Sequence, residues 1–446
     1  MESVVDETGL NENAAPLTHI PRPPMYRRVL SSQYVKNNMF VLAAGLTVSL
    51  CNYLQNPLMV RLLGLPKYQS VVSLVSLSTV FLIPTQILAN VVTRTVATLS
   101  AEGKLAELND LLRRLTAILA LVGAAFAAVF IVESENIANF LHIGSVQPVI
   151  IIALSFIIAF ASPVNGGALG GLLLFSWGAP LSVLPYVLRL VMMYILVRAG
   201  LDINGALLAI VFSSLVGYLA SFIPLRSLLT GPRLPSGSLR PLASYSVTAI
   251  IAAVGNALLF QVDIVLAGHY LPKEQAGLYA VVATLGKMVL FISSSLTTVL
   301  FPQAAALHQR GENTARYVVQ TMAAMVVLSA AIETVFIVIP GVAVRVLYSA
   351  SALGAADQLK WYGLAMLLFA PTQALMTYFL AINDRIFAAI VLVCCAIQAT
   401  LIVARHQSVA DIVQAVIVSI ATLFVTLLVL FAARARHYRL QRRAAA

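Results

Sequence analysis

The chain has 446 residues, of which 60% are hydrophobic and only 10% are charged, and its mean hydropathy is +0.93. These values are typical of polytopic membrane proteins and exclude an ordinary soluble domain. The formal net charge of +11 does not indicate a nucleic-acid partner, because the basic residues flank the apolar segments, as the positive-inside bias predicts.

Apolar runs of about 18 residues or more predict helices that cross a membrane. Twelve such spans are expected, at 38–62, 70–93, 115–133, 146–168, 179–199, 203–226, 243–268, 277–302, 316–340, 358–382, 385–405 and 410–433. Most basic loop residues fall on the side of the two termini, which predicts a multi-pass protein of a bacterial cell (inner) membrane with cytoplasmic N- and C-termini. The first 36 residues lack the apolar region of a signal peptide.

A short repeat divides these spans into two halves. Leu65-Pro-Lys joins the first two spans and Leu271-Pro-Lys joins the seventh and eighth. Six spans per half place both halves in the same orientation. The expected fold is therefore an all-α membrane protein with twelve transmembrane helices in two parallel six-helix bundles around a central cavity. The expected units are a cytoplasmic tail (1–36), two bundles (37–229 and 242–433) joined by a cytoplasmic linker (230–241), and a basic tail (434–446).

Charged residues inside apolar spans are the first functional candidates, because charge in hydrocarbon costs about 2.5–3.5 kcal/mol on insertion scales. Counted from the turn at 271–275, Asp263 lies about 12 Å deep and Lys287 about 16–18 Å deep. The two residues would form a structural ion pair, or would serve transport with Asp263 as a coupling site and Lys287 as an anion contact. Glu333 is a further coupling candidate, with simple hydrogen bonding as the alternative.

Arg189 lies in the middle of the fifth span, where a guanidinium could hold a phosphate with two hydrogen bonds or pair with a carbonyl or an acid. Arg94 ends the second span. It is expected either to anchor that helix at the membrane interface or to face the central cavity. Uncharged polar residues predicted to line the cavity are Asn52, Gln55, Gln86, Asn90 and Asn256, and helix–helix hydrogen bonding is their alternative role.

Several function classes lack their motifs. The sequence has no phosphate-binding G-x-x-x-x-G-K-[ST] loop, so this chain is not expected to be an ATP-driven pump. No His, Cys and Asp cluster has the spacing of a metal site or of a nucleophile with its base. The sequence therefore predicts neither an enzyme nor a cofactor or metal site.

The run from Gln261 to Ala280, followed by Lys287 and by Val299-Leu-Phe-Pro302, resembles the oligosaccharide flippase (polysaccharide biosynthesis protein) family. Its superfamily also contains multidrug and toxin extrusion exporters and lipid II flippases. The resemblance implies a V-shaped protein that alternates between inward- and outward-open states. It also implies that an isoprenoid-diphosphate-linked oligosaccharide moves from the cytoplasmic to the outer leaflet, with Lys287, Arg189 and Arg94 receiving the diphosphate.

The alternative function is a cation-coupled multidrug or small-molecule exporter of the same superfamily. Such exporters often carry an acidic residue in the first span, and residues 39–60 contain none. A membrane scaffold for envelope assembly is a third hypothesis, which the polar residues within the spans disfavour. The expected partners are the lipid-linked oligosaccharide, membrane lipids, H⁺ or Na⁺, and a polysaccharide polymerase and glycosyltransferases.

Overall fold

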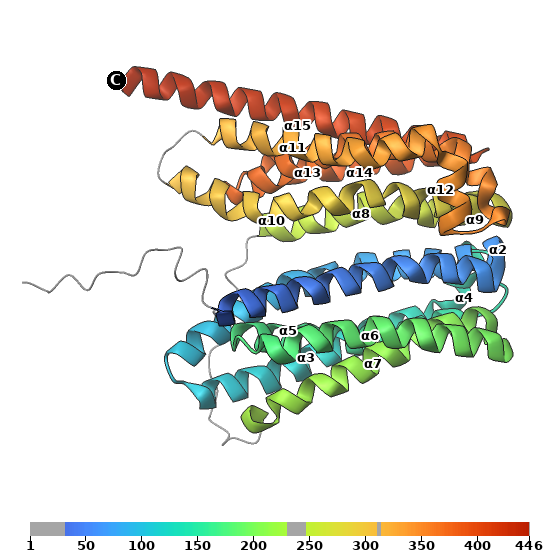
Figure 1. Ribbon diagram of the computed structural model, residues 1–446, viewed down its shortest axis with the longest axis horizontal. Helices are drawn as coiled ribbons and strands as arrows, with labels where there is room; N and C mark the ends of the chain where they lie inside the picture. Colours follow the sequence, from blue (N-terminus) through green and yellow to red (C-terminus); the bar gives the residue numbers. More distant parts are fainter. Residues whose placement is uncertain (1–31, 230–246, 310–313, 446) are drawn as a thin grey trace, which may run out of the picture.

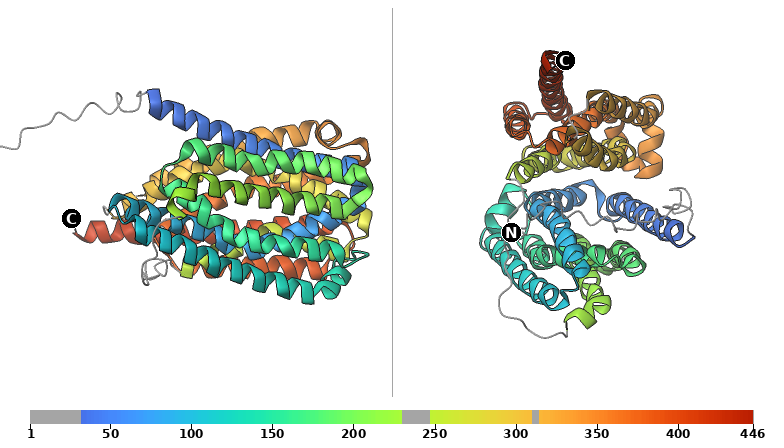
Figure 2. Two further views of the ribbon diagram at one scale, coloured as in Figure 1. Left: turned by 90° about the horizontal axis from the view of Figure 1, so that it is seen from below. Right: turned by 90° about the vertical axis from the view of Figure 1, so that its left-hand side faces the viewer.

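The computed structural model describes residues 32–229, 247–309 and 314–445, and within them every regular element is a helix. The helices form two groups that lie side by side (Figure 1) and that separate clearly in the end-on view of Figure 2. The predicted linker and most of the predicted N-terminal tail lie outside the described residues. The all-α class of the fold is confirmed.

The N-terminal group comprises α2 (Ser32–Ala101), α3 (Leu105–Val132), α4 (Ser134–Phe140), α5 (Gln147–Gly171), α6 (Phe175–Leu196), a π-helical turn (Val197–Leu201) and α7 (Asp202–Leu229). The C-terminal group comprises α8 (Val247–Tyr270), α9 (Lys273–Gly286), α10 (Met288–Gln309), α11 (Ala315–Val338), α12 (Pro340–Leu347), a 3-10 turn (Ala350–Ala355), α13 (Ala356–Ala381), α14 (Ile386–Ala404) and α15 (Val409–Ala445).

Helix α2 consists of two arms that meet at Gly64. This glycine has φ 74° and ψ 168°, a combination that side chains other than hydrogen rarely allow. The segment Leu65-Pro-Lys, expected to join the first two spans outside both helices, already belongs to the second arm. That expectation was wrong because one glycine makes the whole turn.

The predicted span at 277–302 is interrupted at Lys287, where α9 ends and α10 begins. A residue from a distant segment of the chain packs beside this break. The ring of Tyr362, on α13, packs against Gly286 where any larger residue would place its Cβ. An aromatic ring thus lies directly on the last turn of α9, and Lys287 lies at the end of that helix.

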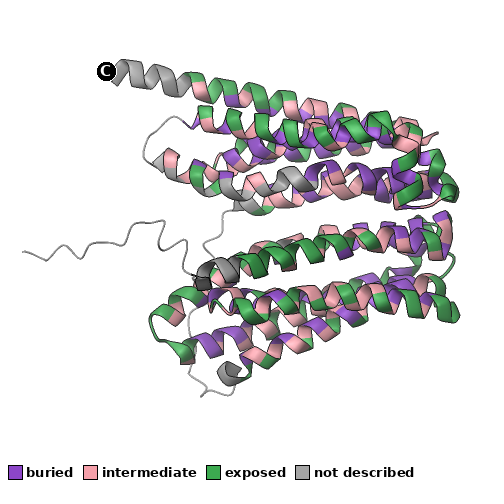
Figure 3. Cartoon of the chain, in the orientation of Figure 1, coloured by how far each residue is buried: buried purple, intermediate pink, exposed green. Residues whose placement is uncertain are grey.

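Nine segments within the described residues are long and apolar enough to cross a membrane. Two of them, Met39–Ala101 and Phe175–Arg226, have 63 and 52 residues and each contains a glycine with positive φ. Exposed residues cover the outside of both groups (Figure 3), including Leu121 at 72% and Val429 at 64% exposure. This apolar surface fits lipid, so the chain is a multi-pass membrane protein, while the exact count of twelve spans stays a prediction.

The two groups contact each other near the end of the molecule that carries Gly64, Leu271 and Tyr348, which we call the joined end. It lies at the right of Figure 1. A Cβ added to Gly277 would lie 2.5 Å from the carbonyl oxygen of Leu65, so the first Leu-Pro-Lys repeat packs against the helix that follows the second. Across the same end, Arg61 Nε donates to the carbonyl of Tyr348 at 2.6 Å. The joined end thus combines close backbone packing with direct hydrogen bonds.

Candidate functional site

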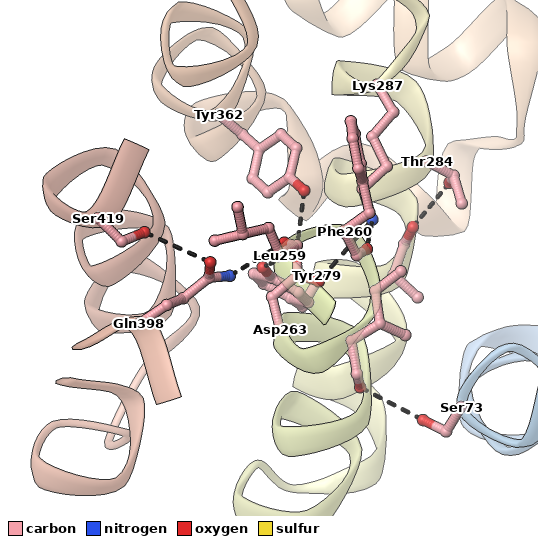
Figure 4. Close-up of polar contacts among 12 residues, drawn as sticks. Ser73, Leu259, Phe260, Asp263, Tyr279, Thr284, Lys287, Tyr362, Gln398 and Ser419 are labelled. Atoms are coloured by element: carbon pink, nitrogen blue, oxygen red, sulfur yellow. Dashed lines mark hydrogen bonds and ion pairs between the residues drawn. The ribbon is translucent and has the colours of Figure 1, made fainter. Parts of the chain in front are cut away.

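Asp263 forms the centre of a buried polar network in the C-terminal group (Figure 4). Its side chain is only 1% exposed. Its Oδ2 accepts hydrogen bonds from the hydroxyls of Tyr279 at 2.8 Å and Tyr362 at 2.9 Å. Helices α8, α9 and α13 each contribute one of these residues, so the network holds three helices together around one carboxylate.

Lys287 lies beside this carboxylate. Its Nζ is 3.8 Å from Asp263 Oδ1, and it donates a hydrogen bond to the carbonyl of Phe260. The ammonium also lies 5.7 Å from the centre of the Phe260 ring, a distance that suits a cation–π contact. The side chain of Lys287 is 16% exposed. The structure thus brings Asp263 and Lys287 together, and the break between α9 and α10 positions the lysine.

The two tyrosines of the network were not identified as site residues from the sequence. Tyr279 follows Asp263 by sixteen positions on the next helix of the hairpin, so their proximity could have been inferred from helix geometry. Tyr362 lies 99 positions further along the chain than Asp263. Only the packing of α13 against α9 brings it to the carboxylate, and no sequence pattern indicates this contact.

A cavity of about 750 Å³ lies within the N-terminal group, between α2, α5, α6 and α7. This volume is typical of a site for one small molecule. Most of its wall is apolar, and its polar residues include Gln86, Ser182, Tyr186, Arg189 and Tyr218. Pro185 of α6 packs against Gly217 of α7 beside this wall, at the position of the missing Cβ. The cavity can therefore receive a ligand with both an apolar part and a polar or charged part.

Arg189 provides the positive charge of this cavity. Its guanidinium lies 5.1 Å from the centre of the Tyr186 ring, and its Nη1 donates to Gln55 Oε1 at 3.4 Å. Its Nε is buried and has no hydrogen-bond partner within the described part of the chain. No carboxylate of residues 32–229, 247–309 and 314–445 forms a salt bridge with it. An arginine with an unused donor and no counter-charge is suited to binding an anion.

The remaining candidates take different positions. Gln86 lines the cavity, whereas Asn52, Asn90 and Arg94 are exposed and do not line it. Asn256 accepts a hydrogen bond from Gln373 at 3.3 Å between α8 and α13, which matches its alternative role in helix packing. Glu333 is 1% exposed, and neither carboxyl oxygen has a partner among the described residues.

Several solved structures of membrane transporters share the fold of this chain. An inward-facing multidrug resistance MATE family transporter of the MOP superfamily matches with a TM-score of 0.73 and 12% identity, over 90% of this chain and 98% of that chain. The MATE multidrug transporter DinF-BH, solved in a complex with a ligand, matches with a TM-score of 0.64 and 12% identity, over 89% of this chain and 94% of that chain. The lipid II flippase MurJ in an inward closed conformation matches with a TM-score of 0.60 and 12% identity, over 87% of each chain.

The chain thus shares its fold with a multidrug resistance transporter and with a lipid II flippase. A family model described as "Polysaccharide biosynthesis protein" matches residues 104–356, more than half of the chain, and the chain belongs to that family. No curated protein sequence matches the chain. The family and the V-shaped transporter fold expected from the resemblance are therefore confirmed.

Proposed function

We propose that this protein flips an isoprenoid-diphosphate-linked oligosaccharide from the cytoplasmic to the outer leaflet of a bacterial cell membrane, for surface polysaccharide biosynthesis. The observation that carries the proposal is Arg189, whose buried Nε lacks a partner in a cavity within the described N-terminal group. Family membership supports a role in polysaccharide biosynthesis. The solved structure of the lipid II flippase MurJ, which shares the fold, supports a lipid-linked substrate.

The walls of the cavity suit such a substrate. The diphosphate would lie against Arg189, whose fixed donors match phosphate oxygens better than a lysine would. Gln86, Ser182 and Tyr218 offer hydrogen-bonding groups to the first sugar. The polyisoprenoid tail would stay in the surrounding lipid, because the cavity is far too small for the whole molecule. Alternating access would then carry the head group across while the termini stay cytoplasmic.

Lys287 has a secondary role in this proposal. Its ammonium is engaged with the Phe260 carbonyl and lies near Asp263, and it does not line the cavity. We assign it to a later step, in which the anionic head group competes with Asp263 for the ammonium. A polymerase and glycosyltransferases would act on either side of this step, because they make and consume lipid-linked glycans.

A cation-coupled exporter of small molecules is the second candidate. The observation in its favour is the shared fold with DinF-BH, a multidrug transporter solved with a bound ligand. The cavity volume of about 750 Å³ also suits a drug-sized ligand. The positive charge of Arg189 opposes it for cationic drugs, because like charges repel in a site of low dielectric constant.

The test is the leaflet location of lipid-linked glycans in cells that lack this protein, with drug susceptibility measured on the same cells. We expect glycans to accumulate in the cytoplasmic leaflet and the wild type to reverse this. Normal glycan export together with raised sensitivity to cationic drugs would instead establish the exporter.

Arg189→Ala should lower glycan export about tenfold or more, because a hydrogen bond to a charged group contributes about 1.5–3 kcal/mol. The matched control is Arg198→Ala. Arg198 also lies over a tyrosine ring, at 5.7 Å from the centre of Tyr194, but it is exposed and outside the cavity. Equal export by both variants would contradict the assignment of Arg189.

A further inference from the structure

Glu333 is a second buried acid of the C-terminal group. It lies on α11, five residues before the helix ends at Val338. Its side chain is 1% exposed, and both carboxyl oxygens lack a hydrogen-bond partner within residues 32–229, 247–309 and 314–445. Gly363 of α13 lies directly against Oε2, where any Cβ would collide with the carboxyl group. The carboxyl group is therefore enclosed by helix backbone rather than by polar side chains.

The helices packed against α11 supply no counter-charge. Helix α10 contains no Asp, Glu, Lys or Arg, and its only histidine, His308, lies near its far end. The charged residues of α13 and α12, Asp357, Lys360 and Arg345, are exposed. Tyr362 of α13 directs its hydroxyl to Asp263. An ionised carboxylate without a partner in such a place is very costly, so Glu333 is stable here as the neutral acid.

Asp263 shows the opposite environment in the same group. Two tyrosine hydroxyls donate to it and an ammonium lies 3.8 Å away, so its negative charge is compensated. The two acids are connected through α13, because Tyr362 binds Asp263 and the next residue, Gly363, covers Glu333. Acids in such contrasting environments often have separate roles in proton transfer.

We infer that Glu333 binds the proton whose movement drives transport, and that it loses this proton when α11 and α13 separate. Before the helices pack, a hydronium ion from the solution gives its proton to the carboxylate, which forms an O–H bond and releases a water molecule. When the helices separate, water reaches the group, the O–H bond ionises and the proton leaves to the solution. Only the protonated form tolerates the packed state, so proton binding and conformation are linked.

The coupling ion follows from the same geometry. A metal cation such as Na⁺ needs several oxygen ligands, and the described residues contain no group of three or more His, Cys, Asp or Glu side chains that could hold a metal ion at Glu333. A proton needs only one carboxylate oxygen. This inference rests on the proposed function, because a driving ion is required only if the chain moves a substrate.

Infrared spectroscopy of the full-length protein in nanodiscs of phosphatidylethanolamine and phosphatidylglycerol tests the site without any transport. We expect a band of a neutral carboxyl group at neutral pH in the wild type and in Glu135→Gln, an exposed control on α4. Glu333→Gln should lack this band. Persistence of the band in Glu333→Gln, or its loss in Asp263→Asn, would overturn the assignment. If Glu333→Gln does not fold, Glu333→Asp should retain the band at a shifted frequency.

The coupling is tested by glycan export in cells whose proton gradient is collapsed with nigericin. Wild-type export should stop, and Glu333→Gln should export no more than cells lacking the protein, whether or not a gradient is present. Gradient-dependent export by Glu333→Gln would overturn the coupling role. A wild type that moves no lipid-linked glycan, but whose infrared band depends on Glu333, would refute the proposed function and leave the proton site standing.

Discussion

The ammonium of Lys287 lies 3.8 Å from the carboxylate of Asp263, yet it donates its hydrogen bond to the Phe260 carbonyl. The carboxylate in turn is held by the hydroxyls of Tyr279 and Tyr362. Charge and hydrogen bonding are thus divided between different partners, so the lysine can leave Asp263 without stripping the acid of its hydrogen bonds.

Asp263→Asn should destabilise the protein, because it leaves the Lys287 ammonium largely buried without a counter-charge. Breaking a buried pair from one side costs about 3–5 kcal/mol. Lys287→Met in the same chain should recover most of this loss, since no buried charge then remains. Unfolding of the detergent-solubilised variants measures both effects, and a double variant no more stable than Asp263→Asn alone would show that the pair is not coupled.

Tyr362→Phe and Tyr279→Phe should each lower the free energy of unfolding by about 1.5–3 kcal/mol, the contribution of a hydrogen bond to a charged group. Their rings would remain packed, so the loss reports the hydroxyl alone. Tyr194→Phe is the control, because that side chain is 49% exposed and lies away from Asp263. Equal free energies of unfolding for all three variants and the wild type would mean that these hydroxyls do not stabilise the buried carboxylate.

Gly277→Ala should open the joined end, because its methyl group would meet the Leu65 carbonyl at 2.5 Å. Neither backbone can move away without shifting its helix. Spin labels on Lys67 and Lys273, both exposed at this end, should report a longer distance in the variant. Gly45→Ala is the control, since nothing lies within 4 Å of the added methyl group. An unchanged distance would show that the contact does not hold the two groups together.

Arg61→Gln should loosen the segment after α12, because Arg61 donates to the carbonyls of Tyr348 at 2.6 Å and Val346 at 3.2 Å. These carbonyls lie at a helix end, where a positive charge is favourable by about 0.3–1 kcal/mol. Limited proteolysis should cut near residues 346–351 faster than in the wild type. Arg345→Gln, which removes an exposed charge from the same helix, should leave the cleavage rate unchanged.

Much of the fold could be predicted because hydropathy reports directly on burial in lipid. The all-α class and the family followed from the apolar runs and from the residues around Asp263. The turn at Gly64 could not be predicted because it depends on a single backbone angle. The packing of the distant Tyr362 ring on Gly286, beside the break at Lys287, also has no local pattern in the sequence. The count of twelve spans and the boundaries of the two bundles stay predictions.

The candidate site was predictable only where helix geometry limits the possible neighbours. Asp263 and Lys287 lie on consecutive segments, so their depths could be compared from the sequence. Whether Asn256 faces a cavity or another helix depends on Gln373, more than a hundred residues away. The same holds for the position of the cavity, since four helices of the N-terminal group build it. Their packing has no signature in local sequence.

The cavity with Arg189 belongs to the first half of the chain, whereas the acids Asp263 and Glu333 belong to the second. A consequence is that the two halves of the chain can be altered separately. Under the proposed function, substitutions along α5, α6 and α7 would alter which head group fits the cavity and would leave Asp263 and Glu333 unchanged. Under the same proposal, exchanging one half between members of the family would give hybrids that keep the proton site and accept another glycan.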